Sequence, residues 1–72
     1  MKTVPITREP VELYKILKFE GLVASGGDAK AAVADGQVQV NGEVETRKRR
    51  QIVAGDVVAF AGQQLKIVRA TD

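Results

Sequence analysis

Cysteine and histidine are both absent from this chain of 72 residues, and its aromatic residues are limited to one tyrosine and two phenylalanines. Without cysteine there is no disulfide, and without either residue type there is no thiolate or imidazole to bind a metal or to act as nucleophile or base. We therefore expect no metal site, no cofactor and no catalytic residue. A small chain without disulfides also fits the reducing cytoplasm.

Long apolar runs are missing as well. No segment approaches the roughly 20 apolar residues of a membrane span, and the first residues, Met1–Ile6, lack the apolar stretch of a signal peptide. The length is near the lower limit for a fold held by a hydrophobic core alone, so we expect a single domain over residues 1–72. The net charge of +2 and the sequence pI near 9.2 mildly favour a polyanionic partner.

The clearest structural signals lie in the stretch SGGDAKAAVADGQVQVNG, which begins at Ser25. Ser25 can cap the exposed amides of a helix that we expect from about Gly27 to Asp35, and Gly36 can take the left-handed conformation that ends it. Residues 37–40 alternate polar and apolar side chains, which predicts a half-buried strand. Asn41-Gly42 is a typical hairpin dipeptide, so the chain should return as another strand.

Another helix is expected before this stretch. Leu13, Ile16 and Leu17 fall on one helical stripe, and Pro10 has the position of a first-turn proline. We therefore expect a helix from Pro10 to Phe19 or Glu20. Together these patterns predict an α+β fold in which a helix–loop–helix motif packs on a small, mostly antiparallel sheet. Strands are expected at residues 4–6, at one sheet edge, and at 37–40, 43–46, 57–61 and 64–69.

Four consecutive cations, Arg47-Lys48-Arg49-Arg50, form the most charged segment of the chain. If the segment is extended, Arg47 and Arg49 point to one side and Lys48 and Arg50 to the other, so the charges form a fan. Such a fan suits a curved phosphate backbone, where each neutralised phosphate releases a counterion. The alternative is a solvated loop without a partner.

Three lysines and two glycines of the expected helices could add to an anion-binding surface. Lys15 and Lys18 are neighbours on the outer side of the first helix, and a tight helix–loop–helix could bring Lys30 of the second helix to the same face. Gly26 and Gly27 leave backbone amides unobstructed at a helix start, where a phosphate could dock. Ordinary surface lysines and a plain helix cap are the alternatives.

The remaining polar and aromatic residues give little support to catalysis or to base stacking. Glu43 and Glu45 would share one face of a strand, where a solvated edge is far commoner than an acid–base pair. Phe19 and Phe60 are expected in the core or at its edge, which leaves few rings for stacking on bases. If the chain binds RNA, it should therefore recognise backbone and shape.

A larger ordered set of residues consists of Leu13 to Leu17, Glu20-Gly21-Leu22, Ser25 with Asp28-Ala29-Lys30, Gly36 to Gly42, Val44 to Arg49 and Ile52 to Val58. This set resembles the S-four RNA-binding domain, named after a small-subunit ribosomal protein, and most closely the stand-alone bacterial YbcJ-like branch. The resemblance covers about residues 11–68. It implies a helix–loop–helix on a small sheet that binds structured RNA, often ribosomal RNA, through the helical motif.

The resemblance also bears on individual positions. Lys30 stands where the family has arginine or lysine, and Arg47-Lys48-Arg49 matches the basic stretch of the YbcJ-like branch. Glu12 and Gly26 depart from the pattern, because basic residues are common at both positions. We expect a non-catalytic RNA-binding protein, and the rival is a protein–protein interaction module whose basic run meets an acidic partner, such as a ribosomal protein. The expected phosphate contacts are Lys15, Lys18, Lys30, Arg47, Lys48, Arg49 and Arg50.

Overall fold

The computed structural model describes residues 1–70, so the last two residues of the expected domain lie outside the described part. The strands are β1 (Lys2–Ile6), β2 (Val11–Glu12), β3 (Val38–Val40), β4 (Glu43–Val44), β5 (Gln51–Ile52), β6 (Val57–Phe60) and β7 (Gln63–Arg69). The helices are α1 (Leu13–Phe19) and α2 (Gly26–Ala34). The connections between these elements are short, as is usual in a small α+β fold.

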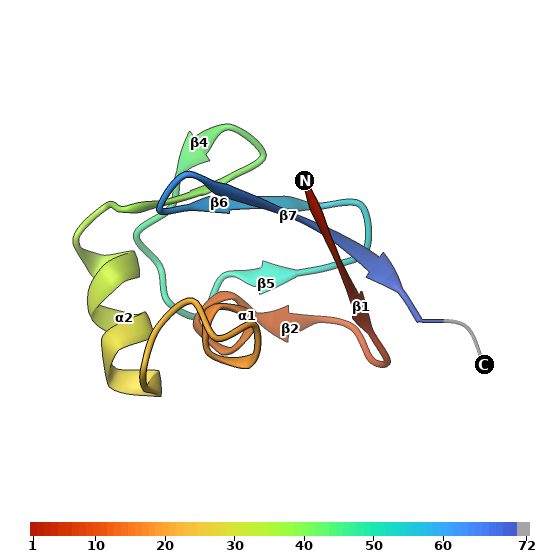
Figure 1. The fold of residues 1–72 in the computed structure, drawn as a ribbon, viewed down its shortest axis with the longest axis horizontal. Helices are drawn as coiled ribbons and strands as arrows, with labels where there is room; N and C mark the ends of the chain where they lie inside the picture. Colours follow the sequence, from red (N-terminus) through yellow and green to blue (C-terminus); the bar gives the residue numbers. More distant parts are fainter. Residues whose placement is uncertain (71–72) are drawn as a thin grey trace.

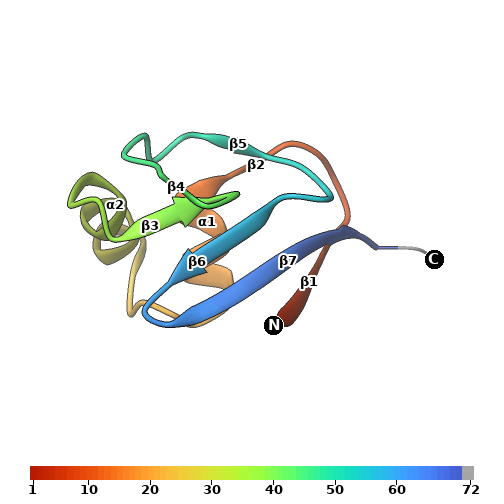
Figure 2. The same cartoon turned by 90° about the horizontal axis from the view of Figure 1, so that it is seen from above.

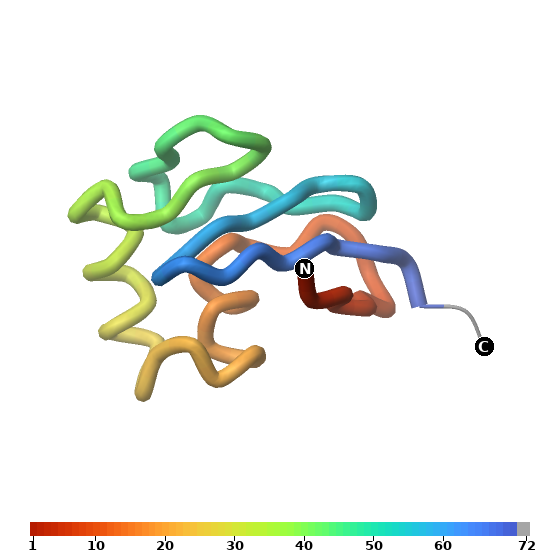
Figure 3. Tube along the Cα trace, turned by 45° about the horizontal axis from the view of Figure 1, so that its top comes forward, coloured from red at the N-terminus to blue at the C-terminus, as the bar shows by residue number. Residues whose placement is uncertain are grey.

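The strands form two sheets (Figure 1). The larger has the order β1-β7-β6-β3-β4, and the smaller pairs β2 with β5. Strand β1 runs parallel to β7, with the first and last strands side by side (Figure 3), whereas the other pairs are antiparallel. The predicted α+β class, with two helices and a mostly antiparallel sheet, is confirmed. The expected strand around Val4-Pro5-Ile6 is also confirmed as an edge strand.

Both helices lie below the five-stranded sheet in the view of Figure 1, and Figure 2, seen from above, shows α1 behind the strands; the core fills the space between helices and sheet. The inward side chains of β7, Leu65 and Ile67, are fully buried, while Lys66 between them is exposed on the other face. This alternation has the two-residue period that the sequence predicts for a half-buried strand. The other fully buried large side chains are Leu13, Ile16, Leu17, Val33, Val38, Ile52 and Val58.

Helix α1 begins at Leu13, so the expectation of a helix from Pro10 with a first-turn proline is wrong. The physical reason lies in the two residues before the helix. Val11 and Glu12 are extended because they pair with Ile52 and Gln51 of β5. That short strand was not expected from the sequence, since two residues are too few to show a periodic pattern.

Helix α2 starts and ends as its sequence signals predict. The Ser25 hydroxyl oxygen accepts a hydrogen bond from the Asp28 amide at 3.1 Å, which satisfies one free donor of the first turn. Gly36, with φ of 77°, provides the left-handed residue after the helix. Asn41 and Gly42, with φ of 54° and 86°, form the tight turn between β3 and β4.

Two expectations about the periphery of the fold are wrong. The returning strand β4 ends at Val44 instead of Thr46, because the chain then leaves the sheet edge. Phe19 was expected in the core or at its edge, but 70% of its surface is exposed. By the helical period, Phe19 lies to the side of the buried stripe of Leu13, Ile16 and Leu17. Phe60, in contrast, packs against the core as expected.

Candidate nucleic-acid interface

The basic run forms a turn, which we call the basic turn (residues 47–50). The Arg50 amide donates a hydrogen bond to the Arg47 carbonyl oxygen at 3.1 Å, so the chain reverses at Lys48 and Arg49. The condition for the fan, an extended segment, is therefore not met. In an extended segment Arg47 and Arg50 would point to opposite sides, whereas the turn brings their side chains to the same carboxylate.

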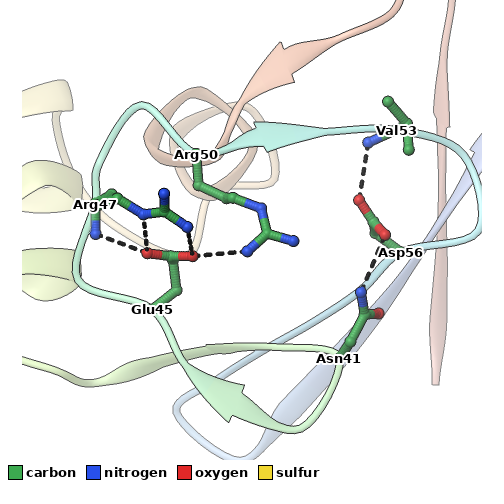
Figure 4. A network of polar contacts seen from close by, with 6 residues as sticks. All are labelled: Asn41, Glu45, Arg47, Arg50, Val53 and Asp56. Atoms are coloured by element: carbon green, nitrogen blue, oxygen red, sulfur yellow. Dashed lines mark hydrogen bonds and ion pairs between the residues drawn. The ribbon is translucent and has the colours of Figure 1, made fainter.

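That carboxylate belongs to Glu45, which was expected at a solvated strand edge. This expectation is also wrong, since only 7% of Glu45 is exposed. Its carboxylate accepts hydrogen bonds from Arg47 Nε at 2.9 Å, Arg47 Nη2 at 3.1 Å and Arg50 Nη1 at 2.8 Å (Figure 4). The Arg47 backbone amide donates a further bond at 3.0 Å. One carboxylate therefore fixes two of the four cations of the basic turn, and we call these three residues the Glu45 cluster.

The Glu45 cluster changes the proton affinity of its members. Hydrogen bonds from the Arg47 side chain and backbone, helped by Arg50 and opposed by partial burial, lower the pKa of Glu45 from its ordinary 4.5 to about 2. The same contact raises the pKa of Arg47. Glu45 is therefore charged at any physiological pH, and the cluster carries a net charge of one positive unit.

We expect the Glu45 cluster to contribute to stability in a pH-dependent way. Because the pKa of Glu45 is lower in the folded chain, its contribution is complete above about pH 4.5 and is lost as the pH falls towards 2. Since Arg47 is exposed to solvent, which screens the pair, we expect a loss of about 1 kcal/mol in the free energy of unfolding. Urea unfolding at pH 5.5 and pH 2.5 measures the loss. Glu45→Gln should show a smaller difference between the two pH values than the wild type, and an equal difference would contradict the assignment.

A second carboxylate links the basic turn to helix α1. Glu12 lies 3.0 Å from the Lys15 ammonium and 3.5 Å from Arg49 Nε. The acidic residue found here, where the S-four pattern commonly has a basic one, therefore joins two of the expected phosphate contacts. Within residues 1–70, Lys48 has no ion-pair partner, so its charge is left free for an anion.

The Tyr14 ring lies close to one lysine of each helix. The Lys30 ammonium lies 4.9 Å from the centre of the Tyr14 ring, and the Lys15 ammonium lies 6.0 Å from it. Both distances are in the range of cation–π attraction. The sequence predicted that a helix–loop–helix could bring Lys15, Lys18 and Lys30 to a common face, and this geometry agrees with it for Lys15 and Lys30.

The basic turn and α1 are also joined through their backbones. The amides of Leu13 and Tyr14 donate to the carbonyl oxygens of Arg50 and Lys48, at 2.9 and 3.1 Å. These bonds satisfy amides of the first helical turn, which has no side-chain cap. An open hollow of about 900 Å³ lies beside the turn, lined by Ala34 at the end of α2 and by residues 46–51.

Lys18 and the two glycines lie at the other end of α1. Lys18 is exposed, and its aliphatic chain lies next to Gly26 at the start of α2. Gly26 and Gly27 form the first turn of α2, as expected. The structure thus divides the predicted site residues into a main group around the basic turn and Tyr14 and a smaller group of Lys18 with these two glycines.

Sequence reasoning missed the residues that hold the cations in place, which are Glu12, Tyr14 and Glu45. One signal was available for Glu45, because an acidic residue two positions before a run of basic residues is within reach of their side chains if the chain turns. The contacts of Glu12 and Tyr14 with the basic turn join segments more than 30 residues apart. A single sequence gives no sign of such contacts.

The structure is that of a small α+β chain with a cationic turn docked on a helix–loop–helix. Comparison with known families assigns the chain to a family with this fold. The chain belongs to the S4 domain family, the S-four family that its sequence resembles, because the model of that family, described as "S4 domain", matches residues 4–68. This match covers both helices, the basic turn and almost all of the sheet.

Two individual proteins and one solved structure are similar to this chain over most of its length. The chain is 52% identical over 69 residues to "Putative RNA-binding protein YbcJ" of Escherichia coli K12, covering 94% of this chain and 99% of that protein. It is 36% identical over 59 residues to "Probable ribosome maturation protein RlbA" of Bacillus subtilis, covering 82% and 83%. The solution structure of the Escherichia coli YbcJ, described as having a motif involved in RNA binding, matches with a TM-score of 0.72 over 94% of this chain and 87% of that one.

Two further features of the described residues bear on the kind of site. In residues 1–70, neither helix has the length and apolar character that crossing a membrane requires. The same residues contain no group of three acidic side chains placed to hold a metal ion together.

Proposed function

We propose that this chain is a non-catalytic RNA-binding protein of the cytoplasm that recognises the backbone and shape of a structured RNA. The observation that carries the proposal is the junction between the basic turn and α1. Because the carbonyls of Arg50 and Lys48 accept bonds from the first amides of α1, the cations of the turn belong to one fixed surface with the two lysines beside Tyr14, Lys15 and Lys30. The names of the YbcJ and RlbA relatives support an RNA partner.

The proposed contacts are between cations and phosphates. Lys48 is the leading candidate within the basic turn, because it is exposed and, unlike the three arginines of the turn, has no ion-pair partner within residues 1–70. Phosphate contacts fix the position of a protein on a nucleic acid without reading its sequence, so discrimination rests on the shape of the folded RNA. The remaining proposed contacts are Lys15, Lys18, Lys30, Arg47, Arg49 and Arg50, with the backbone of Gly26 and Gly27 as a further phosphate contact.

We further propose that the RNA is ribosomal. The support is the similarity to a relative named as a ribosome maturation protein and the general occurrence of this domain type on ribosomal RNA that the resemblance implies. The proposal treats residues 1–72 as a single RNA-binding domain.

The proposal predicts a preference for folded over unpaired RNA. We expect a labelled ribosomal RNA fragment that contains helices and a loop to bind at least about tenfold more tightly than an unpaired RNA of equal length, since a rigid surface with few aromatic rings cannot stack on separate bases. Fluorescence anisotropy at low salt measures both affinities. Equal affinities would contradict recognition by shape, and no binding of either RNA would contradict the RNA-binding function itself.

The rival function is a protein–protein interaction in which the basic turn meets an acidic partner, such as a ribosomal protein. It is favoured only by the charge of the turn, which suits any polyanion. Nuclease treatment separates the two functions, because a partner captured through RNA is released by ribonuclease and a directly bound protein is retained.

A further inference from the structure

The Glu45 cluster leaves several hydrogen-bond donors of Arg47 free. Arg47 binds the carboxylate side-on through Nε and Nη2, and Figure 4 shows its remaining terminal nitrogen pointing away from Glu45. A guanidinium has five N–H donors in one plane, so two bonds to the carboxylate leave three for another ligand. The Arg47 side chain is 72% exposed, whereas that of Glu45 is 9% exposed. The carboxylate therefore lies on the inside of the cluster and the free donors lie on the outside.

The backbone around the cluster is also fixed. The Glu45 amide donates to the Val38 carbonyl oxygen of β3 at 2.9 Å, which ties the carboxylate to the sheet. The Arg47 amide is bound by the carboxylate itself, and the Arg50 amide by the Arg47 carbonyl. Both arginines are thus held at two points, one on the backbone and one on the side chain.

Fixing an arginine before binding has a consequence for affinity. A free arginine samples many rotamers, and ordering it on a ligand opposes binding. A carboxylate that already holds the side chain removes part of that cost. It also adds a negative charge near the ligand, which acts in the opposite direction, but this charge is buried behind two guanidinium groups. The two effects therefore predict opposite results when the carboxylate is removed.

We propose that Glu45 is a positioning residue for phosphate binding, in which the buried carboxylate holds Arg47 and Arg50 so that their free N–H groups donate hydrogen bonds to phosphate oxygens of the RNA. This inference rests on the proposed RNA-binding function. An acidic residue would thus promote the binding of a polyanion, although its own negative charge repels one.

The test compares two variants that remove the same charge. Glu45→Gln should weaken binding to the folded ribosomal RNA fragment about tenfold, although it raises the net charge by one unit. Glu43→Gln makes the same change of charge two residues away, at an exposed position of β4. It should bind as tightly as the wild type or slightly more tightly. The Arg47 Nε–Hε signal in NMR spectra of the free protein tests the same point. It should be resolved from the signals of mobile arginines in the wild type and in Glu43→Gln, and should merge with them in Glu45→Gln.

Arg47→Lys is a second variant. It keeps the net charge and leaves the buried Glu45 side chain unchanged. A lysine cannot bind side-on to the carboxylate and offer a second planar edge, so we expect about fivefold weaker binding. Glu45→Gln binding as tightly as Glu43→Gln, or Arg47→Lys binding like the wild type, would overturn the positioning role while leaving the RNA-binding function intact. A wild type that does not bind the RNA at low salt would overturn the proposed function and this inference with it.

Discussion

Replacing Leu17 with alanine is expected to lower the free energy of unfolding by about 3 kcal/mol, within the 2–5 kcal/mol typical of leucine truncation in a core. Leu17 is fully buried between α1 and the sheet, so the change leaves a cavity that surrounding side chains fill only in part. A domain of this size has a total stability of roughly 4–11 kcal/mol. The single truncation should therefore remove a large share of it, and urea unfolding followed by circular dichroism measures the change.

Phe19→Ala is the matched control for this prediction. Phe19 lies two residues further along the same helix, is larger than leucine, and is 70% exposed. Its truncation creates no cavity, and we expect a change within about 0.5 kcal/mol. A cost for Phe19→Ala as large as that for Leu17→Ala would contradict the placement of the buried stripe on α1.

The second prediction with a large expected effect is a loss of RNA-binding affinity. Changing Lys30 and Lys48 together to alanine is expected to weaken binding to the folded ribosomal RNA fragment by about 10- to 100-fold at moderate salt, because two cation–phosphate contacts are lost. The slope of log affinity against log salt concentration should also become shallower, by between one and two units. Anisotropy titrations at several salt concentrations give both quantities.

The control for the double variant removes the same charge from another face. Lys66 and Arg69 both lie on β7, and Lys66 projects from the face of the sheet that the helices do not cover. Lys66→Ala with Arg69→Ala should reduce affinity only slightly and leave the salt slope nearly unchanged. Equal losses in the two double variants would mean that net charge, rather than the surface around the basic turn, determines binding.

The parts of the fold that were predicted correctly are those with local causes. The start of α2 depends on Ser25 and the Asp28 amide three residues away, and the hairpin between β3 and β4 depends on two residues that can adopt positive φ. Such signals lie within a few residues of each other, so a single sequence displays them. The alternation along β7 was equally visible, because a half-buried strand repeats every two residues.

The wrongly predicted start of α1 depends on a contact between distant segments. Pro10 resembled a first-turn proline, but pairing of β2 with β5 keeps the next two residues extended, and β5 is 40 residues away in the chain. The extended fan considered for the basic run does not form, because Glu45 binds Arg47 and Arg50 where the chain turns, and the charge pattern alone does not show whether it turns. The site was therefore predictable as a set of cations, while their arrangement depended on carboxylates and a tyrosine ring that the charge pattern does not reveal.

The central claim is that the surface formed by the basic turn and the adjoining helices binds folded RNA. Mapping of backbone amide chemical shifts during titration of the labelled protein with the ribosomal RNA fragment tests this claim most directly. The account predicts that the largest shifts occur at residues 46–51, at the first turn of α1 and around Lys30, with little change along β7. Shifts concentrated on β1 and β7, or no shifts at low salt, would contradict it.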